Sequence, residues 1–177
     1  MAADVADALD LDRVIWIPAG EPPHKSGAPL TPPEIRLAMV RAAAAGDPRF
    51  EVATLEIERP GPSFTVDTVR EFRRALPQAD LFLLVGADQF RAFAAWRDPD
   101  QIVRHVRLAV MDREGGSAAA FASEVPGARD AVFAPVRRVD ESSTDIRSRR
   151  RRGEDVRPSV PAGVWTIIER ERLYCDP

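Results

Sequence analysis

Short apolar runs alternate with amphipathic stretches along almost the whole chain, and this alternation constrains the fold more than any other feature of the sequence. The apolar runs are typical of buried strands, and stretches such as Thr65–Leu76 have the spacing of surface helices. Because parallel strands must be joined by crossovers, the pattern predicts an α/β fold with a doubly wound, mostly parallel sheet. Ligands are then expected at the carboxyl ends of the strands.

Strands and helices are expected in turn up to about residue 140. The predicted strands are Val14–Ile17, Phe50–Ile57, Leu81–Val85, Val106–Met111 and Ala131–Val136. The predicted helices are Ala2–Leu9, Glu34–Ala45, Thr65–Leu76, Gln89–Trp96 and Asp98–His105, the last with Asp98 as N-cap and Pro99 at its first position. Two further helices are expected between Ser142 and Tyr174. We therefore interpret 1–177 as one domain, with an α/β core over 1–140 and a helical part over 141–177.

Composition excludes several classes of protein. The 177 residues carry a net charge of −3, and the single cysteine, Cys175, excludes an internal disulfide and a cysteine-based zinc site. The acidic start lacks the segments of a signal peptide, and no apolar run is long enough to span a membrane, so we expect a cytoplasmic protein without a membrane partner. The basic run Arg149–Arg152 suggests a nucleic-acid patch, but Glu154 and Asp155 follow it, so we expect no nucleic-acid partner.

The loop Pro18–Ser26 (PAGEPPHKS) follows the first predicted strand. It contains Lys25, the only lysine of the chain, next to His24. A compact ammonium group in a proline-rich loop is suited to contact a phosphate. Taken alone, an exposed loop with an incidental lysine is the more economical interpretation.

Three other segments could contact a small polar ligand. Hydroxyl groups cluster in Ser63–Thr68 at a helix start, although plain N-capping by Ser63 or Thr65 explains them as well. Gly86 and Asp88 follow a strand, where glycine permits close approach and a carboxylate accepts hydrogen bonds from ribose. Trp96 lies at a helix break, where either core packing or stacking on a ligand is possible.

The segment Ser142–Arg147 (SSTDIR) is the most informative of these. It places hydroxyl groups, free backbone N–H groups and the positive end of the helix dipole at one point, with an arginine one turn further on. This combination favours an anion site, and an ordinary capped helix is the alternative.

The sequence lacks the residues that several other common catalytic and nucleotide-binding sites require. The only histidines are His24 and His105, and neither lies in the context of a catalytic triad. The sequence contains no GxxxxGK[ST] loop and no GxGxxG fingerprint. We predict no protein-bound metal site.

Taken in order, PAGEPPHKS, RPGPSFTVDT, LLVGADQFRAFAAWRD and SSTDIRSRRRRGEDVRPSVPAGVWTIIERERLY resemble the bacterial nicotinate-nucleotide adenylyltransferases. The resemblance implies a Rossmann-like nucleotidyltransferase sheet and transfer of an adenylyl group from ATP to nicotinate mononucleotide. The products would be deamido-NAD and pyrophosphate, with Mg²⁺ entering with ATP. ATP and nicotinate mononucleotide are the implied partners, and a homo-oligomer is possible.

Site roles also follow from the resemblance, position by position. Lys25 and Arg147 would be catalytic, with Lys25 and His24 facing phosphate. The residues implied in ATP binding are Ser143, Thr144, Arg147, Gly86 and Asp88, and those implied in binding nicotinate mononucleotide are His24, Lys25, Thr65, Thr68, Asp88 and Trp96. Among them, Thr65 would hold the nicotinate carboxylate and Trp96 would stack on the pyridine ring.

The sequence departs from this family at its start. Members of the family begin with a strand that leads into a GGxFDPxHxGH loop, and nothing here matches that loop. In a sheet of order 3-2-1-4-5 the strand concerned is the central one, and its loss would leave backbone groups unpaired. We expect a start site placed too late or a shortened chain, and a short form with little or no activity. An in-frame stop codon just before Met1 would contradict this expectation.

Two other functions stay open at this point. A related adenylyltransferase would act on nicotinamide mononucleotide or phosphopantetheine. A non-catalytic nucleotide-binding remnant would bind nicotinate mononucleotide without releasing pyrophosphate.

Overall fold

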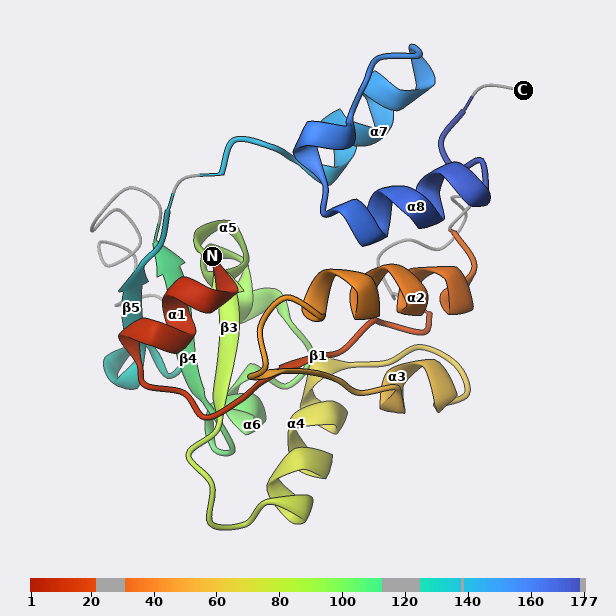
Figure 1. The fold of residues 1–177 in the computed structure, drawn as a ribbon. Helices are drawn as coiled ribbons and strands as arrows, with labels where there is room; N and C mark the ends of the chain where they lie inside the picture. The colour runs from red at the N-terminus through yellow and green to blue at the C-terminus, as the bar shows by residue number, and fades with distance from the viewer. Residues whose placement is uncertain (22–30, 113–124, 138, 176–177) are drawn as a thin grey trace. The chain divides into compact units, whose positions relative to one another are not determined.

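The computed structural model describes residues 1–21, 31–112, 125–137 and 139–175, which form two compact units (Figure 1). Unit 1 comprises Met1–Asp12 and Pro62–Arg138, and unit 2 comprises Arg13–Gly61 and Val139–Pro177. The elements of unit 1 are α1 (Ala2–Ala8), α4 (Thr65–Ala75), β3 (Phe82–Gly86), α5 (Ala87–Arg91), η1 (Phe93–Ala95), α6 (Pro99–Val103), β4 (Arg107–Asp112), η3 (Ala128–Asp130) and β5 (Val132–Pro135). The elements of unit 2 are β1 (Val14–Trp16), α2 (Pro33–Ala44), β2 (Phe50–Val52), α3 (Leu55–Glu58), α7 (Ser143–Arg151), η4 (Arg157–Ser159) and α8 (Ala162–Arg170).

Unit 1 is built on a parallel sheet in the order β3-β4-β5. Alternate residues of β4 enter different apolar clusters: Leu108 and Val110 join one cluster, and Ala109 joins the other. Both faces of the strand are therefore covered, which explains why its sequence is a continuous apolar run instead of an alternating one.

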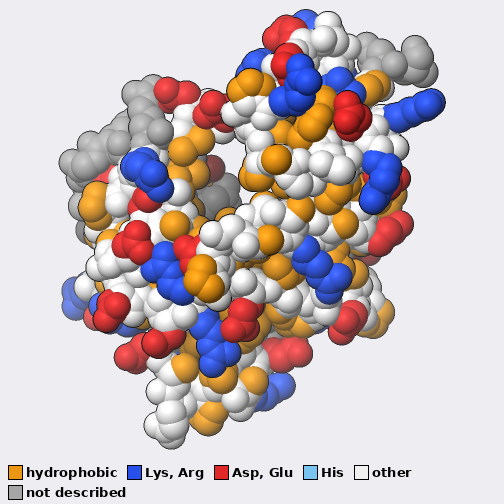
Figure 2. Space-filling model, viewed as in Figure 1, with side chains coloured by type: hydrophobic (Ala, Val, Ile, Leu, Met, Phe, Trp, Pro, Cys, Tyr) orange, Lys and Arg blue, Asp and Glu red, His pale blue; other side chains and the backbone are white. Residues whose placement is uncertain are grey.

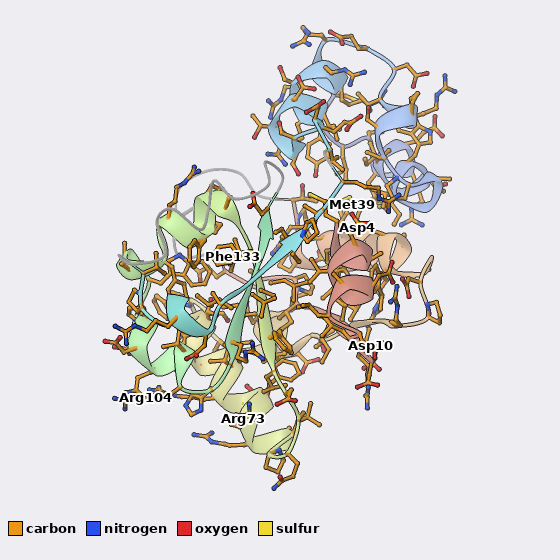
Figure 3. The ribbon with its side chains drawn as sticks, turned by 90° about the vertical axis from the view of Figure 1, so that its left-hand side faces the viewer. Asp4, Asp10, Met39, Arg73, Arg104 and Phe133 are labelled. Atoms are coloured by element: carbon orange, nitrogen blue, oxygen red, sulfur yellow. The ribbon has the colours of Figure 1, made fainter. Side chains whose placement is uncertain are left out.

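The larger cluster of unit 1 contains Phe90 and Phe93, which are completely buried. Phe90 meets Phe133 of β5 edge to face at 5.6 Å. The Arg73 guanidinium of α4 donates to the carbonyl oxygens of His105 (2.7 Å) and Ala79 (2.8 Å), and Figure 3 shows this side chain. Arg73 thereby links the end of α4 by hydrogen bonds to the residues that precede β3 and β4.

Helix α1 packs on the other face of this sheet, beside β5 (Figure 1). Val5 and Ala6 are completely buried, and Val5 shares a cluster with Ala109 and Ala134. Asp4 accepts hydrogen bonds from the backbone N–H (3.1 Å) and Nε (2.9 Å) of Arg137, just beyond β5. An apolar face and a polar contact therefore fix α1 on the sheet.

Unit 2 contains a parallel pair of strands, β1 and β2, and two helices packed on each other, α2 and α8. A Cβ atom built on Gly163 of α8 would lie 3.2 Å from the Cβ of Ala42, so small side chains allow the two helices to approach closely. Ile167 and Ile168 of α8 are buried, and Val164 and Leu173 are half-buried.

The α/β class and the parallel strands are confirmed. In the predicted order 3-2-1-4-5, strand 1 is the strand that has no match in this sequence, so β1 to β4 correspond to strands 2 to 5. The predicted order then requires β1 to pair with β2 and β3 to pair with β4, and both pairs are present. The interpretation of 1–177 as one domain stays a prediction. Among the described residues, no helix is long and apolar enough to cross a membrane.

The predicted strand Phe50–Ile57 is too long, because β2 ends at Val52 and Leu55–Glu58 is a short helix. Strand β1 ends at Trp16, whose carbonyl accepts from the N–H of Ala53 at 3.0 Å. Beyond that bond, β1 offers β2 no further ladder partner, so the chain turns into α3.

The predicted helix Gln89–Trp96 is also wrong in part. It divides into α5 and the 3₁₀ helix η1, and Trp96 follows in an extended conformation (φ −71°, ψ 163°). Phe90, Phe93 and Trp96 recur every three residues, the repeat of a 3₁₀ turn, and burial of the two phenylalanines favours that tighter winding.

The predicted N-cap of α4 is wrong, whereas Asp98 is confirmed as the N-cap of α6, followed by Pro99. The N-cap of α4 is Phe64, so neither Ser63 nor Thr65 occupies that position. Asp98 is the N-cap of α6, but its backbone is left-handed (φ 50°) and its side chain makes no capping bond.

Candidate functional site

The N-terminus of α7 forms as the SSTDIR segment predicts. Ser142 is its N-cap with an extended backbone, and its hydroxyl accepts from the N–H of Asp145 at 3.0 Å. The first N–H groups of a helix have no partner within it, so those of Ser143 and Thr144 are available to a ligand. Both residues are exposed, and the positive end of the helix dipole lies at the same point.

Arg147 lies one turn into α7, and its partners differ from those of Arg149. Its Nη2 donates to the hydroxyl of Thr144 at 3.4 Å, and its guanidinium carbon lies 6.0 Å from the centre of the Tyr174 ring. In the part of the chain that the structure describes, no carboxylate forms an ion pair with it. Arg149, in contrast, pairs with Asp145 (3.9 Å) and Glu154 (3.3 Å). Arg147 therefore keeps a positive charge for an external anion.

Two arginines at and beyond the end of the basic run are paired with neighbouring acids. Arg152 pairs with Glu154 at 2.7 Å, and Arg157 pairs with Asp155 at 2.8 Å. Hydrogen bonds from Arg157 lower the pKa of Asp155 to about 2, and those from Arg152 lower the pKa of Glu154. These acids offset the charges of Arg152 and Arg157, while Arg147, Arg150 and Arg151 have no ion-pair partner among the described residues.

At the carboxyl end of β3, Gly86 and Asp88 are close to each other. A Cβ atom on Gly86 would lie 2.7 Å from Oδ1 of Asp88, so any larger residue would require this carboxylate to move. Asp88 is exposed, and its Oδ2 accepts from Nε2 of Gln89 at 3.2 Å. This geometry leaves a carboxylate facing solvent at the edge where a parallel sheet binds ligands.

A long-range contact joins the start of α4 to the segment that follows η1. The Arg97 guanidinium lies 4.3 Å from the centre of the Phe64 ring, which brings Thr65 and Trp96 into one region of unit 1. Trp96 is half-buried and packs on Phe93, with ring centres 5.3 Å apart. One face of the indole is thus fixed by the core, while part of the ring stays accessible to a ligand.

The predicted site residues fall into two sets. Unit 1 holds Thr65, Thr68, Gly86, Asp88 and Trp96, and unit 2 holds Ser143, Thr144 and Arg147. Thr65 is half-buried at the first position of α4, and Thr68 is 4% exposed. Thr68 therefore lines the core more than the surface. His24 and Lys25 lie outside the described residues.

Sequence reasoning missed three residues at or near these sets. They are Arg97, Arg36 and Asp112. Asp112 ends β4 and is 5% exposed, and an acid that closes an apolar strand is a signal that could have found it. Arg97 contacts Phe64, and Arg36 donates to the carbonyls of Ala19 and Gly20; these partners are distant in sequence, and the sequence offers no signal for such contacts.

Comparisons with known proteins agree on the family. The family model described as cytidylyltransferase-like matches residues 1–149. The chain is 41% identical over 173 residues to a probable nicotinate-nucleotide adenylyltransferase of Thermus thermophilus, covering 98% of this chain and 89% of the relative. It is 37% identical over 177 residues to a protein of the same name from Thermomicrobium roseum, covering 98% of this chain and 83% of that one.

A solved structure shares the fold. It is the nicotinic acid mononucleotide adenylyltransferase of Plasmodium falciparum complexed with NaAD, with a TM-score of 0.75 at 12% identity, covering 98% of this chain and 89% of that one. By its sequence relatives and its family model, this chain belongs to the bacterial nicotinate-nucleotide adenylyltransferases within the cytidylyltransferase-like family.

Proposed function

We propose that this protein transfers the adenylyl group of ATP to nicotinate mononucleotide, with release of deamido-NAD and pyrophosphate. The relatives named for this activity support the proposal. The observation in the structure that carries it is Arg147, a guanidinium without a carboxylate partner among the described residues, at the start of α7.

In this reaction a phosphate oxygen of nicotinate mononucleotide attacks the α-phosphorus of ATP, and the bond from that phosphorus to the β-phosphate oxygen breaks. Pyrophosphate leaves with the electron pair. The protein needs no nucleophile for this step, and its role is to position two anionic substrates and to neutralise developing charge. We propose that Ser143, Thr144 and Arg147 bind the ATP phosphates, with Lys25 and His24 also facing phosphate.

We assign the pyridine nucleotide to residues of unit 1. Trp96 would stack on the pyridine ring, because its indole is held by Phe93 yet only half-buried. Thr65 would donate to the nicotinate carboxylate, and Asp88 would accept from sugar hydroxyls close to the Gly86 backbone. Thr68 would support Thr65 from the buried side of α4.

Mg²⁺ is proposed to enter as its complex with ATP. No three His, Cys, Asp or Glu side chains come together within the described ranges, and Mg²⁺ is often held by phosphates, water and few protein groups. When bound, the ion neutralises phosphate charge. A cytoplasmic location, to which the single cysteine is suited, and a homo-oligomeric state complete the proposal.

The test is pyrophosphate release with ATP and each of three acceptors: nicotinate mononucleotide, nicotinamide mononucleotide and phosphopantetheine. The 177-residue chain and an upstream-extended form are assayed side by side. We expect the acid to give the highest kcat/KM. Preference for the amide or for phosphopantetheine, or binding without pyrophosphate release by both forms, would refute the assignment.

A variant links this activity to the structure. Arg147→Ala removes a charged hydrogen-bond donor, which is worth about 1.5–3 kcal/mol, so the KM for ATP should rise roughly 10- to 100-fold. Arg151→Ala removes the same charge at the other end of the same helix and should leave the KM for ATP unchanged.

A further inference from the structure

Two of the last described residues of the chain have a backbone conformation that residues other than glycine rarely adopt. Arg172 and Tyr174 both have positive φ values, 50° and 58°. Such backbone costs free energy and persists only where surrounding contacts hold it. The N–H of Leu173 donates to the carbonyl of Ile168 at 2.9 Å and supplies one such contact, and the Tyr174 side chain supplies two more.

The first contact of Tyr174 is with Thr31. The two hydroxyl oxygens lie 3.1 Å apart, and the residues are 143 positions apart in sequence. Thr31 is itself held in place, because Nε of Arg36 donates to its carbonyl at 3.0 Å. The same guanidinium donates to the carbonyls of Ala19 and Gly20. The Tyr174 hydroxyl therefore contacts a residue, Thr31, whose backbone Arg36 holds in place.

The second contact of Tyr174 is with Arg147, whose guanidinium lies over its ring at 6.0 Å. A cation over an aromatic face is attracted by the ring quadrupole, and the interaction does not use the hydrogen-bond donors at the edge of the guanidinium. It restricts the arginine side chain, and the guanidinium donors that do not contact Thr144 stay available to phosphate. A carboxylate partner would instead neutralise the charge and occupy the donors.

We infer that Tyr174 is a positioning residue for the phosphate site: it acts through Arg147, and Thr31 and Arg36 hold it in place. The inference rests on the proposed function only in naming ATP as the anion. Because the bound conformation of Arg147 is partly prepared in the free protein, less side-chain entropy is lost on binding.

Binding of ATP, measured by calorimetry on the 177-residue chain, tests this inference without requiring catalysis. Tyr174→Leu should weaken binding about two- to fivefold, the range for a cation–π contact at an incompletely buried site. Tyr174→Phe keeps the ring and should lose less. Thr31→Val removes the other hydroxyl and should match Tyr174→Phe.

A double-mutant cycle separates positioning from general damage to the fold. If Tyr174 acts through Arg147, Tyr174→Leu should have no further effect on ATP binding in an Arg147→Ala background. An equal loss in both backgrounds, or no loss in the wild-type background, would overturn the inference. Thermal melting of each variant shows whether the tail remains folded, and Tyr174→Phe keeps the test decisive if Tyr174→Leu melts early.

A spectroscopic measurement gives an independent answer. Tyr174 is the only tyrosine of the chain, so ring-labelled tyrosine gives the NMR signals of this residue alone. Arg147→Ala should shift these signals in the ligand-free protein, and Arg151→Ala should not. Unchanged signals in Arg147→Ala would overturn the inference. Absence of pyrophosphate release while ATP binding and these effects persist would overturn only the proposed function.

Discussion

Trp96 packs on the core and still keeps part of its surface exposed. Its ring contacts Phe93, which is completely buried, and the residue itself is only half-buried. Asp98, two residues later, has a left-handed backbone, and Pro99 follows it at the start of α6. The backbone therefore leaves η1 and turns at this point. The indole is thereby held at the edge of the cluster and not inside it.

We predict that Trp96→Leu raises the KM for nicotinate mononucleotide about tenfold and leaves the KM for ATP unchanged. Loss of stacking with the pyridine ring is the reason, and aromatic pairs contribute up to about 1.5 kcal/mol beyond their buried area. Steady-state kinetics with each substrate varied in turn measures the effect. Trp96→Phe should recover most of the loss.

Trp16→Leu is the matched control, since Trp16 is an exposed tryptophan of β1 in unit 2. It should leave both KM values unchanged. If Trp96→Leu lowers only the melting temperature, with wild-type KM values, the stacking role is wrong.

At the scale of elements, α1 shows how a short helix is fixed on a sheet. Seven residues are too few to form a stable helix alone, so its stability comes from packing. Val5 and Ala6 supply the apolar part, and the Asp4–Arg137 pair supplies the polar part. Figure 3 shows Asp4 on this helix.

This pair predicts a pH-dependent contribution to stability. Hydrogen bonds from Arg137 lower the pKa of Asp4 from 3.8 to about 2. A carboxyl group with a lowered pKa stabilises the folded state above its unfolded pKa, and this contribution is lost as the pH falls from about 4 to 2. Asp4→Asn should therefore lower the urea midpoint at pH 7, and the difference from wild type should vanish near pH 2.

Asp10→Asn is the control for this measurement. Asp10 lies just beyond α1 with φ 49°, a conformation that asparagine tolerates as well as aspartate does. It removes a carboxylate close to the same helix and should leave the urea midpoint at pH 7 unchanged. A constant gap between Asp4→Asn and wild type from pH 7 to pH 2 would contradict the ion-pair explanation.

At the scale of the whole molecule, the charges are mixed and not segregated. The net charge is −3, and acidic and basic side chains are interspersed on the face shown in Figure 2. Two arginines of the basic run, Arg149 and Arg152, are paired with neighbouring acids, and so is Arg157 further along the chain. A continuous basic surface, which non-specific binding to nucleic acid requires, is not expected from this distribution.

We therefore predict no salt-dependent retention of the protein on immobilised DNA or RNA. Chromatography at about 50 mM and 200 mM salt measures this, because each phosphate contact steepens the salt dependence. Retention at the lower salt concentration that is lost at the higher one would reveal a basic surface that these pairs do not neutralise.

The sequence by itself determined the α/β class, the approximate positions of all five strands and the capped start of α7. These features depend on local patterns: apolar runs mark buried strands, and Ser142 can cap only the residues next to it. The central β4 was predicted within one residue at each end, since its run is buried on both faces.

Only the tertiary structure decided where β2 ends, how the segment before Trp96 winds and which side chains support the candidate site. A strand continues only while a neighbour offers hydrogen bonds, and β1 ends before the apolar pattern of Phe50–Ile57 does. Arg97 reaches Phe64 and Tyr174 reaches Thr31 and Arg147 across long sequence separations. No local pattern records such contacts, because they exist only after the chain has folded.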